Sequence, residues 1–265
     1  RPSRPAERLA GALAPLWPPL LLLAAVAAVW EAAIRLFQVP AFVLPAPSAI
    51  AAALVQHRDN LAGAALVTAG EVVSGFLLAA LAGMAVAVTI VRFDRLGRAL
   101  YPLVVLFQTV PKVALAPIFI LWFGYELAPK VLLIVVIAFF PVALDMLAGM
   151  QSVDPTLVSL MRSVGAGRGE ILRRIQIPAA LPQLVAGLKV AITFSVIGAI
   201  VGEFAGASAG LGYMIQFAST QLDTPLVFAA LVVVSALGIA FYYVIELAER
   251  LLVPWSAKFD PAGRG

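Results

Sequence analysis

The stretch LAPKVLLIVVIAFFPVALDMLAGM, residues 127–150, decides the class of fold. It is almost continuously apolar over 24 residues, and a helix that crosses a bilayer needs about 20. A transmembrane β-strand would be shorter and would alternate between apolar and polar residues. The stretch therefore predicts a transmembrane α-helix.

The rest of the chain has a similar composition. Of its 265 residues, 63% are hydrophobic and 12% are charged, and the mean hydropathy is +1.03. A soluble domain of this size could not cover so much apolar surface. The sequence predicts an all-α membrane protein, a single multi-pass domain over residues 1–265. Its six transmembrane helices are expected at about residues 18–37, 62–91, 99–123, 127–150, 184–201 and 226–253.

The basic residues predict the orientation of these spans. Lys and Arg gather in the cytoplasmic loops of membrane proteins. Thirteen of them lie in the two terminal segments and in the loops after the second and fourth spans, whereas three lie on the other face. Both termini are therefore expected in the cytoplasm, with the helices in a bacterial inner membrane. Because this placement accounts for the net charge of +4, no nucleic-acid partner is expected.

The long loop after the fourth span carries helix signals of its own. Asp154-Pro155 is an N-cap followed by proline at the first helical position, and Gly165 is a left-handed C-cap. A second helix is expected from about Arg168 to Ile177, stopping at Pro178. Two short helices joined by a bend suit either a basic, lipid-facing connector or a docking element for a cytoplasmic partner. The residue pattern alone leaves both open.

The motif in this loop is similar to that of a known family. Gly165, Ile175 and Pro178 stand at the spacing of the Glu-Ala-Ala loop of ABC importer permeases, and Ile177 replaces the Leu of that pattern. Residues 159–161, Ser-Leu-Met, depart from the Glu-Ala-Ala part. The chain resembles the permease subunits of binding-protein-dependent ABC importers. In that family this loop is the coupling helix, which seats in a groove of the ATPase subunit.

Further segments carry the same resemblance. LPAPS (44–48), PKVALAP (111–117), LWFG (121–124) and IPAALP (177–182) are similar to permeases of the nitrate, sulfonate and taurine group. VGEFAGASAGLGY (201–213) looks closest to permeases for pyrimidine precursors of thiamine and to riboflavin-type relatives. The resemblance implies a small organic heterocycle of the thiamine-pyrimidine or flavin type as substrate, or a small anion such as a sulfonate.

The resemblance also implies partners and docking residues. The importer would be a homodimer of this permease that works by alternating access, with ABC ATPase subunits and an extracytoplasmic substrate-binding protein. ATP and Mg would bind the ATPase, because this chain lacks a Gly-x4-Gly-Lys-Ser/Thr motif and is expected to hold no cofactor. The coupling loop would be a helix-bend-helix at about residues 154–182. Its expected docking residues are Arg162, Ser163, Val164, Gly165, Ala166, Gly167, Ile175 and Pro178.

Ionisable residues inside the spans indicate a translocation path, because such residues are costly in a bilayer and usually functional. Lys112 lies between two prolines that predict a kinked third helix. An alternative reading is that Lys112 pairs with Glu71 or Asp145 only to neutralise buried charge. The candidate path residues are Gln108, Thr109, Lys112, Glu71, Asp145, Glu203 and Tyr213.

Three other classes of function can be weighed from the same residues. An ion-coupled secondary transporter would use Glu71, Lys112 and Asp145 as a proton relay. An intramembrane enzyme needs a nucleophile and base or metal ligands, but the chain has no cysteine and its one histidine, His57, lies outside the spans. No catalytic or metal-binding residues are therefore expected. A purely structural or assembly subunit would tolerate substitutions in the third and fifth spans.

Overall fold

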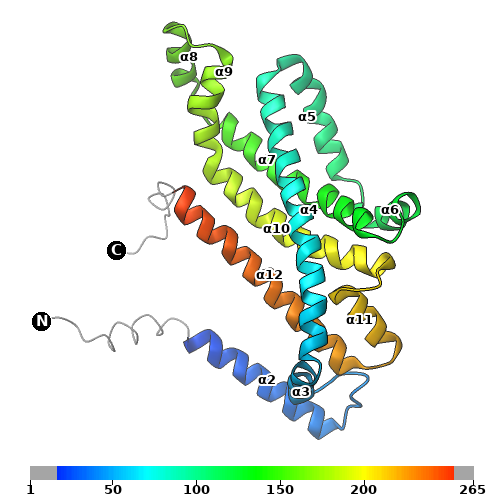
Figure 1. Cartoon of the computed structure of the whole chain (residues 1–265). Coiled ribbons are helices and arrows are strands. Elements are labelled where there is room, and N and C mark those ends of the chain that lie inside the picture. The colour runs from blue at the N-terminus through cyan, green and yellow to red at the C-terminus, as the bar shows by residue number, and fades with distance from the viewer. Residues whose placement is uncertain (1–16, 254–265) are drawn as a thin grey trace, which may run out of the picture.

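The computed structural model describes residues 17–253, and every regular element in this range is a helix (Figure 1). Five helices are long and apolar enough to cross a bilayer, and a sixth crossing results if one bent pair counts as a span. The protein is therefore an all-α membrane protein, as predicted, while the six-span count stays a prediction. The elements are α2 (Trp17–Phe37), α3 (Pro47–Gln56), α4 (Arg58–Arg92), α5 (Asp94–Gln108), η2 (Lys112–Leu115), α6 (Ala116–Phe123), α7 (Leu127–Gln151), α8 (Pro155–Ser163), α9 (Arg168–Ile171), η3 (Leu172–Gln176), α10 (Ile177–Gly206), α11 (Leu211–Thr220) and α12 (Thr224–Leu252).

The third predicted span is not one helix. The chain leaves the α-helix after Gln108 and resumes at Lys112, and the two parts meet at 88°. Pro111 explains the break, because it lacks an N–H and its ring disfavours a helical conformation in the residue before it. The expected kinked helix at 99–123 is thus replaced by α5 followed by the η2–α6 segment.

The second loop helix does not stop at Pro178, so that prediction is wrong. α9, the π-helical turn η3 and α10 form one continuous helical run from Arg168 to Gly206, which is 39 residues long. Pro178 lies in the first turn of α10, directly after the wide π-turn. A proline is tolerated where a regular i−4 bond has already been given up. The predicted fifth span, 184–201, is therefore the middle of a much longer helix.

The core is a three-helix contact among α4, α7 and α10. Small residues let the three helices approach closely. A Cβ at Gly83 would lie 2.8 Å from Val142 Cβ and 2.9 Å from the Phe139 carbonyl oxygen, and one at Gly187 would lie 2.9 Å from the Pro141 carbonyl oxygen. Close backbone approach gives helices in lipid the dispersion contacts that hold them together.

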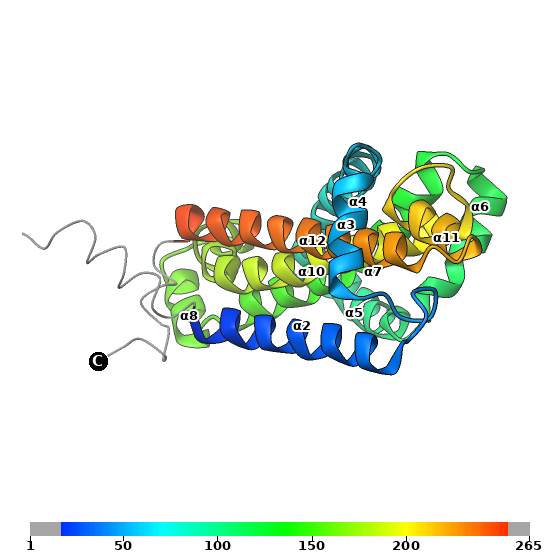
Figure 2. The same ribbon diagram turned by 90° about the horizontal axis from the view of Figure 1, so that it is seen from below.

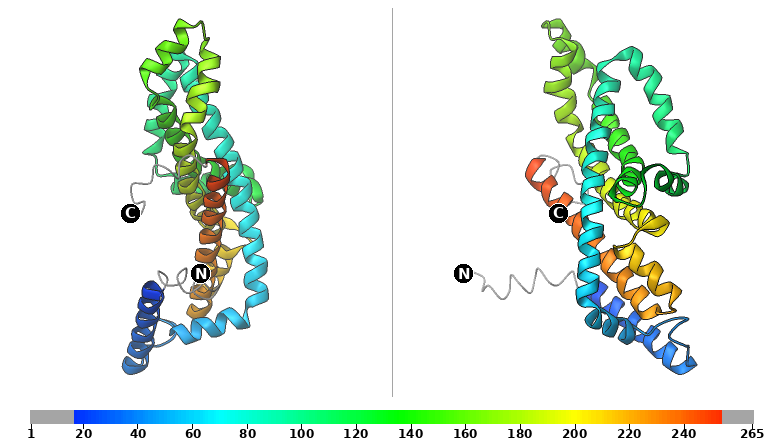
Figure 3. Two further views of the ribbon diagram at one scale, coloured as in Figure 1. Left: turned by 90° about the vertical axis from the view of Figure 1, so that its left-hand side faces the viewer. Right: turned by 45° about the vertical axis from the view of Figure 1, so that its right-hand side comes forward.

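α2 is set apart from this core. Only 6% of its apolar window is buried, and in Figure 3 it lies beside the bundle rather than within it. α3 crosses the direction of α2 and α12 and bridges α2 to α4 (Figure 2). The junction is polar: the Glu31 carboxylate pairs with Arg35 at 2.6 Å and accepts the Ser48 hydroxyl at 2.8 Å. An exposed apolar helix of this length suits contact with lipid tails.

The glycine contacts predict a difference between two alanine substitutions on the same helix. Gly83→Ala is expected to lower the free energy of unfolding by about 1–3 kcal/mol, because the new methyl group overpacks the α4–α7 contact. Gly63→Ala, where a Cβ would meet nothing within 4 Å, should leave stability unchanged or raise it by up to about 1 kcal/mol. Thermal unfolding in detergent measures both. Equal stability of the two variants would contradict the close approach.

Candidate translocation site and coupling segment

The segment α8–α9 projects past the ends of α7 and α10 (Figure 1). The Asp154 carboxylate caps α8 by accepting the Thr156 N–H at 2.7 Å, and this hydrogen bond lowers the pKa of Asp154. The helix ends as predicted at Gly165, with φ +87°. There the Gly165 N–H donates to the Arg162 carbonyl and the Ala166 N–H to the Met161 carbonyl. These two bonds are the Schellman pattern that a left-handed glycine permits.

The predicted docking residues divide into a tip and a base. Arg162, Ser163, Val164, Gly165 and Gly167 are exposed at the bend, with Ala166 half-buried beside them. Val164 is 73% exposed and Leu160 is 59% exposed, so the tip displays apolar side chains. Ile175 and Pro178 instead lie further along the helical run and are half-buried. Sequence spacing alone cannot show this division, because it depends on α9 continuing into α10.

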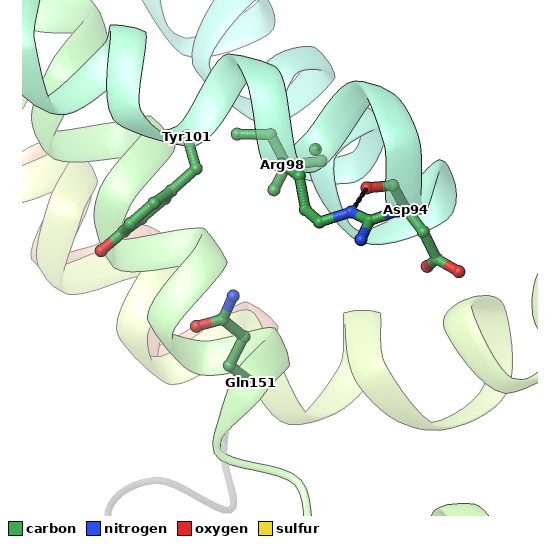
Figure 4. A pocket seen from close by; sticks show the side chains of 6 residues that line it. Asp94, Arg98, Tyr101 and Gln151 are labelled. Carbon is green, nitrogen blue, oxygen red and sulfur yellow. Dashed lines mark hydrogen bonds between the residues drawn. The ribbon is translucent and has the colours of Figure 1, made fainter.

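An ion pair joins this segment to α5. Arg168 Nη1 lies 2.6 Å from Asp94 Oδ2, and both side chains are 59% exposed, so the pair contributes little energy. Beside it lies a hollow of about 770 Å³ between α4, α5 and α7. In Figure 4, Arg98 and Tyr101 extend from α5 and Gln151 extends from α7, and the Arg98 Nε donates to the Asp94 carbonyl at 3.3 Å. The α8–α9 segment therefore contacts the start of α5.

Lys112 lies in a second cavity, of about 460 Å³, directly after the helix break. Its Nζ donates to the Gln108 carbonyl at 2.8 Å and lies 4.6 Å from the centre of the Phe140 ring. No carboxylate forms an ion pair with Lys112 in the described part of the chain, so the alternative of pairing with Glu71 or Asp145 is wrong. The apolar walls come from α5 and α7, and include Leu103, Phe107, Val136 and Phe139.

Glu71 and Glu203 belong to a different cluster, at the end of the bundle opposite α8, here called the distal end. Glu71 pairs with Lys130, and Glu203 accepts the Thr68 hydroxyl at 2.7 Å. Glu71 is 2% and Glu203 0% exposed. We define Thr68, Glu71, Lys130 and Glu203 as the distal cluster.

The other two predicted path residues lie elsewhere. Tyr213, on α11, is half-buried and stacks on Phe217 with ring centres 6.0 Å apart. Asp145 lies against Gly187 of α10, away from the Lys112 cavity.

Lys130 was missed as a site residue. From the sequence it was counted only among the three basic residues of the non-cytoplasmic face, whereas the structure buries it in the first turn of α7. The available signal was its place inside the apolar run that begins at Leu127. Among residues 17–253 there is no group of three or more His, Asp or Glu side chains that could hold a metal ion.

The described residues thus form a bundle of apolar helices with a sharp break after Gln108 and a projecting helix-bend-helix. The family model described as "binding-protein-dependent transport system inner membrane component" matches residues 75–255. The chain belongs to this family of ABC transporter permeases, and it is a transport subunit, not an enzyme. The protein is thus a multi-pass inner-membrane component.

Relatives and solved structures agree with that assignment. The formylaminopyrimidine transport permease protein ThiX of Halalkalibacterium halodurans is 35% identical over 91% of this chain and 96% of its own length. The riboflavin transport system permease protein RibX of Chloroflexus aurantiacus is 35% identical over 86% of each chain. The putative aliphatic sulfonates transport permease protein SsuC of Bacillus subtilis is 32% identical over 91% and 88%. An inward-facing structure of the MetNI methionine ABC transporter shares the fold with a TM-score of 0.59 at 17% identity, covering 72% of this chain and 97% of that one.

The Asp154 cap predicts a pH dependence of α8. Because the pKa of Asp154 is lowered in the folded state, the cap stabilises α8 above the usual carboxyl pKa and is lost as the pH falls through the lowered value. Amide hydrogen exchange over residues 156–163, corrected for intrinsic rates, should show fraying of α8 only at the acid end. Asp154→Asn, which caps without titrating, should remove the pH dependence, and Asp154→Ala should fray at every pH. A pH dependence that persists in Asp154→Asn would contradict this origin.

Proposed function

We propose that this chain forms the translocation path of an ATP-driven ABC importer as one half of a homodimer. An ABC ATPase docks at the tip of α8–α9, a substrate-binding protein docks at the distal end, and both termini lie in the cytoplasm. The observation that carries the proposal is the single helical run from Arg168 to Gly206. Its 39 residues extend over about 58 Å at 1.5 Å per residue. One element therefore links the proposed ATPase dock to the distal end.

The mechanism follows from this linkage. ATP-driven closure of the two ATPases moves the bends at Gly165 together, and each bend moves the α9–α10 run because no flexible loop interrupts it. α10 packs on α4 and α7 along its length, so the motion reaches the whole core as rigid-body rocking. Such a change between two packed arrangements is how alternating access works.

The Lys112 cavity supports a contact with the substrate. Irregular backbone at membrane depth is tolerated where it lines a cavity, and broken helices mark substrate sites in other transporters. The walls are apolar and aromatic, and Lys112 adds one cation without a carboxylate partner among residues 17–253. Such a site suits a flat heterocycle with a hydrogen-bond acceptor edge, of the pyrimidine or flavin type that two relatives carry by name. A small anion such as a sulfonate is the second candidate.

The ion-coupled alternative finds no support. A proton relay requires Glu71, Lys112 and Asp145 to approach one another, but Glu71 pairs with Lys130, and Lys112 contacts Gln108 and Phe140. The family assignment points the same way, because its members work with binding proteins.

Co-purification tests the ATPase dock. Gly165→Val is expected to weaken ATPase binding about 5- to 150-fold, because a β-branched residue at φ +87° is strained by about 1–3 kcal/mol. Gly165→Asn is the matched control, since Asn tolerates left-handed backbone. A Cβ at this position meets nothing within 4 Å, so neither substitution introduces a steric clash with the rest of the chain. Equal ATPase binding by both variants, or no ATPase binding by the unchanged chain, would contradict the proposal that the ATPase docks at the tip of α8–α9.

Substitution of Lys112 tests the path. Losing a charge-assisted hydrogen bond of about 1.5–3 kcal/mol should make uptake by Lys112→Met about 10- to 100-fold slower. Lys112→Arg keeps the charge and should retain most of the uptake. Uptake of riboflavin, a formylaminopyrimidine and an aliphatic sulfonate is measured in cells that express the whole importer, with ATPase co-purification as the assembly control. Unchanged uptake by Lys112→Met would exclude Lys112 from the path.

A further inference from the structure

The distal cluster holds the start of α11 with hydrogen bonds from two other helices. Glu203 of α10 accepts the Gly212 N–H and the Thr68 hydroxyl, and Thr68 of α4 in turn accepts the Leu211 N–H at 2.9 Å. The first N–H groups of a helix have no partner within the helix, and a carboxylate near them is favourable. Glu203 and Thr68 therefore cap α11 from outside the helix, and Thr68 does so from 143 residues away in the sequence.

Two glycines leave room for this cap. Gly210 has φ +108°, a conformation that favours glycine, and the position of its missing Cβ is occupied by the Glu203 carboxylate. A Cβ at Gly212 would lie 2.8 Å from Glu203 Oε2 and 3.0 Å from the Ile200 carbonyl oxygen. The Gly-Leu-Gly sequence at 210–212 thus forms a tight backbone cradle around a single buried carboxylate.

The Glu71–Lys130 pair balances the charge beside this cap. Glu71 and Glu203 are neighbouring carboxyl groups that are both almost fully buried, and Lys130 is the cation that pairs with Glu71. Glu71 Oε2 is buried and receives no donor from residues 17–253. Removing Lys130 alone would leave two carboxylates buried side by side, which is strongly unfavourable.

The apolar side of α11 packs in a second apolar cluster. Leu211 and Ile215 pack there with residues of α3, α4 and α12, and Ala218 on the same side of α11 is fully buried. The opposite side of α11 carries the stacked pair Tyr213 and Phe217. The hydrogen bonds of Glu203 and Thr68 therefore anchor the first turn of α11 to α10 and α4, in addition to these apolar contacts.

We propose that Glu203 and Thr68 are positioning residues that fix α11, and with it the Tyr213–Phe217 pair, at the distal mouth of the path. Lys130 and Glu71 keep the buried charge around them balanced. The existence of a translocation path rests on the proposed function, whereas the attachment of α11 to α10 and α4 does not. When α10 moves, α11 moves with it, because its first turn is bonded to α10 and α4 and not only to the helices that follow.

The chain has no cysteine, so one introduced cysteine reports on one position. Ala218, fully buried under α11, becomes reactive only when α11 detaches, and Ala79, fully buried in the α4–α7 contact, reports global unfolding. The full chain is placed in nanodiscs without any ATPase, and a water-soluble maleimide is added. Ala218→Cys should react about tenfold or more faster when combined with Glu203→Gln or Thr68→Val. Ala79→Cys should stay unreactive in the same backgrounds.

A second pair of variants tests the charge balance. Lys130→Met should also accelerate labelling of Ala218→Cys, and adding Glu71→Gln should bring the rate back close to that of the unchanged protein. Loss of packing at Lys130 would not be repaired by removing a charge, so this rescue separates the electrostatic role from a merely structural one.

The proposal would be overturned if neither Glu203→Gln nor Thr68→Val changed the rate of maleimide labelling of Ala218→Cys. It would also be overturned if the Glu71→Gln/Lys130→Met protein were labelled as fast as Lys130→Met. If a charge variant exposes Ala79→Cys, the neutral and nearly isosteric Thr68→Val decides the attachment. Labelling needs no ATPase, so a negative result here leaves the co-purification test of the importer unaffected.

Discussion

The bilayer requires every backbone N–H and C=O at membrane depth to find a partner within the protein. Long uninterrupted helices such as α4 and α7 satisfy this requirement by themselves. The break between Gln108 and Lys112 does not, and it is therefore the most informative irregularity in the chain. Its place beside a cavity, with the Lys112 ammonium returning a hydrogen bond to the Gln108 carbonyl, is what that requirement demands of a broken helix.

Local features were readable from the sequence, and features that depend on neighbouring turns were not. The Asp154 cap and the Gly165 bend each involve residues within a few positions, and both were predicted correctly. From the sequence, a kink was predicted at Pro111 and the end of a helix at Pro178. Pro111 breaks its helix and Pro178 does not, because a π-turn precedes Pro178 and places it at the start of a new regular segment. No pattern of residue types in the sequence predicts the π-turn at 172–176.

The candidate site could be predicted as a set of residues but not as an arrangement. Charges inside apolar runs are rare, so Glu71, Lys112, Asp145 and Glu203 were visible as candidates. Which of them meet depends on how helices pack, and Glu71 and its partner Lys130 are 59 residues apart. Neither helical periodicity nor spacing carries information over that distance, and so the two sites were first read as one path.

Pairing gives the intramembrane charges different roles. A buried charge with a partner is neutralised by the protein and mainly fixes geometry, as Lys130 and Glu71 do between α7 and α4. Lys112 differs, because within residues 17–253 its ammonium contacts a backbone carbonyl and an aromatic face rather than a carboxylate, so its charge is not neutralised by an ion pair. Within one membrane domain, the chain therefore separates a charged cluster that holds helices together from a cation that lines an apolar cavity and has no carboxylate partner among residues 17–253.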